Sequence, residues 1–177
     1  MTGKRKAAVV ALTGGLLVGL GIQLIPADRR NPAVVREIAW DAPRTGELAR
    51  RACYDCHSNE TVWPWYSSIA PASWLIAKDV DEGREHLNFS EWDGPNEGLD
   101  EVIDMVESGE MPLSRYVVLH RNAALTEPEK TELIRGLRET FAADPPAHDA
   151  HGESEAGFIE GSPALHGLFA NLRPVTR

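Results

Sequence analysis

The chain contains very little cysteine: Cys53 and Cys56 are the only two among 177 residues. A secreted scaffold held together by disulfides needs more cysteines than this, so the pair has to be explained as a local site. The sequence also lacks internal repeats, and no stretch alternates between apolar and polar residues as a half-buried strand does. These absences predict a mainly α fold rather than a sheet protein or a disulfide scaffold.

Basic charge is scarce in the centre of the chain. Residues 41–140 hold ten basic and twenty acidic side chains, whereas residues 1–40 hold six basic and two acidic ones, and the whole chain has a formal net charge of -9. Phosphates would repel a domain this acidic, which excludes nucleic acid as a partner. The charge suits a redox partner protein with a basic patch, and a solvated surface explains it equally well.

An uncharged run of nineteen residues, 7–25, follows three basic residues near the N-terminus. At a rise of 1.5 Å per residue, this run is about long enough to cross a hydrocarbon core of ~30 Å. It is longer than a signal-peptide core and no Ala-x-Ala site follows it, which favours an uncleaved signal anchor over a cleaved signal peptide. Residues 1–6 would then form a cytoplasmic tip. Gly15 and Gly19 form a Gly-x-x-x-Gly step through which two anchors could pair as a homodimer.

The rest of the chain is expected to be a small helical domain with long loops. We predict a linker over 26–44, a haem-binding domain over 45–141 and a mobile acidic tail over 142–177. The expected helices begin near Thr45, run from Ser73 (as the cap) to Leu87, run from Gly98 to Ser108 before Gly109, and begin at the capping box Thr126–Glu129. A domain of this size with such loops usually has something large at its centre.

The sequence Cys53-Tyr54-Asp55-Cys56-His57 carries the chemistry. Cys-x-x-Cys-His is the attachment motif for a c-type haem. Two thiols at i and i+3 of a helical turn share a face and can each form a thioether with a haem vinyl group. The next residue, His57, is then placed to bind the iron as the proximal ligand. The motif therefore predicts one covalent haem c.

Two other kinds of site use the same two cysteines. A thioredoxin-like redox pair needs a surrounding βαβ pattern, which the sequence lacks. A structural zinc site needs four protein ligands, and there is no second cysteine pair. A plain disulfide in an interaction module without haem is the remaining alternative.

The second axial ligand is predicted to be Met111, which lies between a helix stop and Pro112. A thioether on such a loop can reach the free face of the haem and raises its reduction potential. His120 and His86 are the alternatives, and Met105 is expected to pack in the core. We also expect the aromatic residues of 63–74 to cover the haem, although ordinary core packing explains them too.

These residues resemble the bacterial haem-binding domain family related to cytochromes c. The likeness covers about residues 20–140. It includes Arg50–Thr61, Trp63–Tyr66, Ile69–Pro71, Ser73–Ile76, Asp79–Val80, Glu82–Arg84, Leu87–Trp92, Gly109–Pro112, Tyr116, His120 and Ala124–Thr126, together with Gln23 and Asn31–Pro32. The resemblance implies one c-type haem, an N-terminal anchor and a cytochrome c-like helical fold. The chain departs from the family pattern in its long tail and in Arg121, where a proline is common.

The sequence thus predicts a c-type cytochrome that carries single electrons between extracytoplasmic redox partners and is not an enzyme. Its haem domain is expected on the periplasmic side of the inner membrane, because covalent haem attachment takes place on that side, as the cytochrome resemblance implies. The alternative is a haem-based sensor or a peroxidase-like enzyme with an open sixth iron site.

Overall fold

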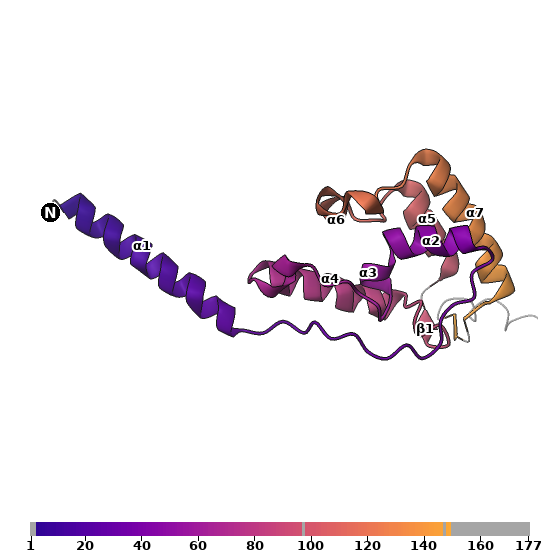
Figure 1. The fold of residues 1–177 in the computed structure, drawn as a ribbon, viewed down its shortest axis with the longest axis horizontal. Coiled ribbons are helices and arrows are strands. Elements are labelled where there is room, and N and C mark those ends of the chain that lie inside the picture. Colours follow the sequence, from indigo (N-terminus) through magenta and orange to yellow (C-terminus); the bar gives the residue numbers. More distant parts are fainter. Residues whose placement is uncertain (1–2, 97, 147, 150–177) are drawn as a thin grey trace, which may run out of the picture.

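The computed structural model describes residues 3–96, 98–146 and 148–149, and it is mainly helical, as predicted (Figure 1). The elements in chain order are α1 (Gly3–Gly21), η1 (Ile22–Leu24), α2 (Pro43–Ala52), α3 (Tyr54–His57), η2 (Trp65–Ser68), α4 (Ala72–His86), β1 (Pro95–Asn96), α5 (Leu99–Ser108), α6 (Ser114–Leu119), η3 (Arg121–Ala123), α7 (Glu127–Ala143) and β2 (His148–Asp149). The two strands are two residues long and pair in parallel.

Helix α1 lies apart from the domain and buries none of its residues (Figure 1). Within the described ranges it is the one helix that is long and apolar enough to cross a membrane. Its apolar side chains are exposed against the rest of the described residues; Leu12, for example, is 75% exposed. The N-terminal membrane span predicted over 7–25 therefore matches a real helix, which continues into η1.

The core of the domain lies where α2, α5 and α7 meet. Leu48 of α2 and Leu133 of α7 are completely buried, and Ile103 and Val106 of α5 complete the cluster. The apolar stripe of α5 predicted this face, because residues at i and i+3 project from the same side of a helix. Phe141 continues the core towards the end of α7.

Capping residues predicted the end of α5 and the start of α7 correctly, but not the start of α4. Gly109 ends α5 with φ 80°, a left-handed conformation that favours glycine. The capping box at the start of α7 forms as predicted, with Thr126 and Glu129 each accepting from the other's backbone N–H. The cap predicted at Ser73 is wrong: α4 begins after Pro71, without a side-chain cap, and Ser73 is buried inside its first turn.

Residues 26–44, expected as a linker, also contribute to the domain. Ile38 is only 3% exposed, and its backbone N–H donates to the Phe89 carbonyl at 3.1 Å. At its far end the segment reaches α7, where Ala39 donates its N–H to the Asp144 carboxylate at 2.9 Å. The predicted mobile tail lies outside the described residues from 150 onwards.

Candidate functional site

The two cysteines and His57 lie at the joint between α2 and α3. Cys53 ends α2, and its carbonyl accepts hydrogen bonds from the backbone N–H groups of Cys56 (3.1 Å) and His57 (2.9 Å). This tight turn places all three side chains along one cavity of about 400 Å³. The volume falls in the range of small-molecule sites, roughly 300–1,000 Å³. Most of the other walls are apolar and include Leu87, Phe89, Val102, Val106, Leu113 and Leu137.

The imidazole of His57 is held in the orientation that a metal ligand needs. Its Nδ1–H donates to the carbonyl of Gly83 at 2.8 Å and to that of Leu87 at 3.2 Å. A proton fixed on Nδ1 leaves the lone pair of Nε2 for a metal ion. Burial lowers the pKa of His57, despite the two carbonyls, and so favours the neutral form that binds metals. The structure therefore supports His57 as an iron ligand.

Gly83 allows α4 to come this close to the cysteine turn. A Cβ at this position would lie 2.7 Å from the Cys56 carbonyl oxygen and 3.1 Å from the Cys56 Cβ. Real Cβ atoms do not approach backbone atoms at 2.7 Å, so any larger residue would push α4 away. Gly83 belongs to the segments that carry the family resemblance, which gave it no role. In the structure, its lack of a side chain sets the distance between His57 and the carbonyls of α4.

Burial raises the pKa of both thiols, Cys53 to about 12 and Cys56 to about 11. An active thioredoxin-like cysteine needs a lowered pKa, so these thiols do not match that alternative. Among the described residues, no group of three or more His, Cys, Asp or Glu side chains is arranged to hold a metal ion, so the zinc alternative has no ligand set there. Both cysteines are free rather than joined in a disulfide.

Two methionines lie on the walls of the same cavity. Met111 is there, as a second axial ligand must be, and it also packs against the core. Met105, which we expected to be a core residue, lines the cavity as well. Of the alternative ligands, His86 lines this cavity, whereas His120 lines an adjoining one of about 230 Å³ that shares Cys56 and Tyr116 with it. His120 is bonded there to the Tyr66 hydroxyl at 3.1 Å and stacks on Tyr116 at 4.1 Å.

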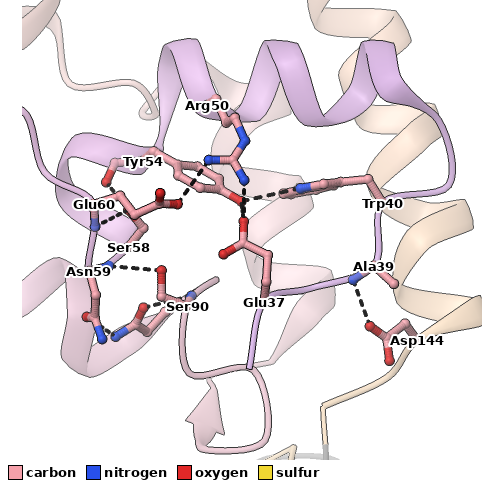
Figure 2. A network of polar contacts seen from close by, with 11 residues as sticks. Glu37, Ala39, Trp40, Arg50, Tyr54, Ser58, Asn59, Glu60, Ser90 and Asp144 are labelled. Carbon is pink, nitrogen blue, oxygen red and sulfur yellow. Dashed lines mark hydrogen bonds and ion pairs between the residues drawn. The ribbon is translucent and has the colours of Figure 1, made fainter. Parts of the chain in front are cut away.

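The side chain of Tyr54, between the two cysteines, holds the turn in place through its contacts with residues of other segments (Figure 2). Its buried hydroxyl donates to the Glu37 carboxylate and accepts from Trp40 Nε1 at 3.3 Å, while Arg50 covers its ring at 4.4 Å from the centre. The ring of Phe89 stacks against the other side at 5.5 Å. Burial and the bond to Glu37 together raise the pKa of Tyr54, so the phenol stays protonated. Sequence reasoning missed this role because its partners lie in other segments of the chain.

Tyr54→Phe should lower the free energy of unfolding by about 1–2 kcal/mol, because the Trp40 N–H and Glu37 each lose a buried partner. A double-mutant cycle with Glu37→Gln, followed by denaturant unfolding, checks this. We expect a coupling of roughly 1 kcal/mol between the two sites. Strictly additive effects would contradict a direct interaction between the hydroxyl and the carboxylate.

A second set of polar side chains holds the loop after α4 against the residues that follow His57. Asn88 Nδ2 donates to Asn59 Oδ1 at 3.0 Å, and Asn59 N–H donates to Ser90 Oγ at 3.0 Å (Figure 2). Phe89 N–H donates to the His57 carbonyl at 2.9 Å. Because these groups are buried and bonded, the loop holds the backbone at His57 from a second side, in addition to α4.

Of the aromatic residues of 63–74, which we expected to cover the haem, none lines the cysteine cavity. Tyr66 lines the adjoining cavity, and Trp65 is 77% exposed. Core packing does not explain that side chain either. The aromatic core is built from other rings instead: Trp40, Tyr54, Phe89, Trp92 and Phe141 contact one another in series.

The donors present fit the haem predicted from the sequence: two thiols, an oriented imidazole and a thioether face one apolar cavity. Comparison with known proteins points the same way. Residues 17–139 match a family model described as a haem-binding domain. No curated protein and no solved structure matches the chain. The match spans more than half of the chain, which therefore belongs to the haem-binding domain family.

Proposed function

We propose that this chain is a c-type cytochrome that binds one haem covalently and transfers single electrons between extracytoplasmic redox partners. The observation that carries the proposal is that Cys53, Cys56 and His57 line one apolar cavity with Met111 in another of its walls. When bound, the haem supplies an iron that changes oxidation state by one electron. We propose an electron carrier rather than an enzyme, because a methionine ligand would fill the sixth iron position that a peroxidase-like reaction needs open.

Each residue of the site has a defined task in this proposal. Cys53 and Cys56 provide the thioether sulfurs, and His57 and Met111 are the axial ligands. The carbonyls of Gly83 and Leu87 hold the His57 ring and increase the basicity of its free nitrogen. The apolar walls exclude water from the ligands.

One guanidinium is placed to balance the negative charge of haem carboxylates. Arg115 lines the cavity and is bonded to Asp79 at 2.9 Å. That bond raises the pKa of Arg115 and keeps it charged. We infer that Arg115 orients the propionate edge of the haem.

We further infer that α1 is an uncleaved anchor that places the domain on the periplasmic face of the inner membrane. The helix has the length and composition of a membrane span. Covalent attachment of haem on that side of a bacterial membrane gives the orientation. The Gly15–Gly19 step is open, with nothing within 4 Å of either position, so pairing of two anchors remains a prediction.

The covalent link is tested by removing the thiols. Wild-type protein should keep its haem stain on a denaturing gel, and its intact mass should exceed that of the polypeptide by one haem. Cys53→Ala combined with Cys56→Ala should abolish both signals. Each single variant serves as the matched control, because one remaining thioether still holds the haem. Stain that survives in the double variant, or that leaves the wild type on denaturation, would refute covalent attachment.

A further inference from the structure

One end of the domain carries almost no charge, which is unusual in a chain with a net charge of -9. Residues 61–77 contain no charged side chain at all, and residues 111–126 contain two arginines and no acidic residue. These two segments include η2, the first part of α4 and α6. Asp55 and Asp79, from other segments, reach this end, but each is bonded there: the Tyr116 hydroxyl donates to Asp55 at 2.6 Å, and Arg115 donates to Asp79 at 2.9 Å.

Large apolar side chains are exposed on this end. We call Val62, Trp65, Ile69, Leu75, Val118 and Leu119 the apolar end face; their exposed fractions range from 47% to 77%. Three of them, Val62, Leu75 and Leu119, line the same hollow of about 230 Å³, and the other three are close to these in the chain. The bond between Tyr66 and His120 joins η2 to the end of α6 below them. Contiguous apolar surface of this kind marks an interaction site.

The apolar end face lies next to the end of the anchor. Gln23, in η1, exchanges two hydrogen bonds with the backbone of Ala70, one of 3.1 Å from its Nε2 and one of 2.9 Å to its Oε1. Trp74 Nε1 donates to the Ile25 carbonyl at 3.2 Å, and Arg29 donates to Ser68 Oγ at 2.5 Å. Figure 1 shows α1 leaving the domain at the end where α4 begins.

These contacts fix how far the face can lie from the bilayer. Gln23 and Ile25 directly follow the apolar helix, so they lie at the edge of the hydrocarbon core if α1 spans it. Ile69 is one residue from Ala70, which Gln23 holds. Tryptophan at an apolar–polar boundary is typical of membrane interfaces, and Trp65 is the most exposed residue of the face.

We propose that the apolar end face rests on the outer leaflet of the membrane that α1 spans, with its apolar side chains in the boundary between headgroups and acyl chains. The proposal relies on α1 as the anchor and is independent of the haem chemistry. The partner is the lipid bilayer, since the face continues the surface of the anchor and its two segments, 61–77 and 111–126, carry no acidic side chain. Arg29, which is bonded to Ser68 beside the face, suits anionic headgroups.

The test uses the full chain with haem in nanodiscs that hold one copy and contain phosphatidylethanolamine and phosphatidylglycerol. A photoactivatable lipid, reactive just below the headgroup, maps contacts by mass spectrometry. We expect labelling of Trp65, Ile69, Val118 and Leu119. Val35 is the internal control, because it is 75% exposed but its backbone is bonded to Ser90, which lies outside the two segments of the face. Labelling of the face should exceed that of Val35 roughly tenfold, because burying one such side chain is worth about that factor.

Each other result overturns a distinct part of the argument. If α1 is labelled but the face is labelled no more than Val35, the domain does not contact the bilayer and the proposal fails. Unlabelled α1 means that the anchor itself is wrong. If discs holding two copies show cross-links between the faces of two chains and lose the lipid label, a second copy covers the face and the lipid proposal fails.

Introducing negative charge on the face tests whether the face itself contacts the lipid. Val118→Glu combined with Leu119→Glu should lower lipid labelling of Trp65 roughly tenfold. Both side chains are more than half exposed, so the domain should still fold and keep its haem spectrum. Val34→Glu combined with Val35→Glu is the matched control and should leave the labelling unchanged. Equal effects of the two pairs would contradict a role for the face.

Discussion

Gly83→Ala should yield little or no folded protein that carries haem. Helix propensity alone predicts the opposite sign, a gain of about 1 kcal/mol for replacing a helical glycine with alanine. The added methyl would, however, lie 2.7 Å from the Cys56 carbonyl oxygen, a backbone atom that cannot move without the cysteine turn. Overpacking of this kind costs about 1–3 kcal/mol, and more where backbone must shift. It also separates the Gly83 carbonyl from His57 Nδ1, which lie 2.8 Å apart.

The measurement is the yield of haem-stained protein together with its denaturant midpoint. Glu85→Ala is the matched control, because this residue lies two positions along the same helix and is exposed. It should leave both values close to those of the wild type. A Gly83→Ala variant that is more stable than wild type and fully loaded with haem would show that α4 does not pack on the cysteine turn as described.

The elements that could be predicted from the sequence are those defined by residues close together in the chain. Helix α5 has its stripe and its Gly109 stop within eleven residues, and α7 has its capping box within four. Helix α6 was missed because its six residues show neither a cap nor a full apolar stripe. The packing of residues 35–39 was missed because their partners, such as Phe89 and Asp144, lie far away in sequence.

The same distinction holds for the site. Cys53, Cys56 and His57 form a contiguous motif, so their chemistry could be read directly. What orients His57 depends on the carbonyls of Gly83 and Leu87, and no side-chain pattern reports a carbonyl. The expectation for the aromatic residues of 63–74 rested on a related assumption: nearness in sequence to His57 suggested nearness in space, but Trp65 points outwards at the end beside the anchor.

Met111→Ala should change the iron site itself. Met111 and Met105 line the same cavity, so proximity alone does not tell which sulfur binds the iron. Met105 lies within α5, whereas Met111 lies after the helix has ended, with its N–H bonded to the Met105 carbonyl at 3.0 Å. Of the two, the loop residue has more freedom to direct its thioether away from the helix, which is why we assign the ligand to Met111.

A thioether favours the reduced iron, so loss of Met111 should lower the reduction potential, within the ~0.8 V that axial ligands span. The ferric protein should lose its methionine-to-iron charge-transfer band, and the ferrous protein should bind carbon monoxide. Met105→Ala is the matched control, since it removes a second methionine from the same cavity and should keep the band. His120→Ala should also keep it, because that imidazole is bonded to the Tyr66 hydroxyl and lines only the adjoining cavity. Loss of the band in Met105→Ala instead would move the ligand to α5. A wild-type protein that lacks the band, and whose ferrous form binds carbon monoxide only after His120→Ala, would have two histidine ligands. A wild-type protein that already binds carbon monoxide would have an open iron site, and the sensor or peroxidase-like function would then replace electron transfer.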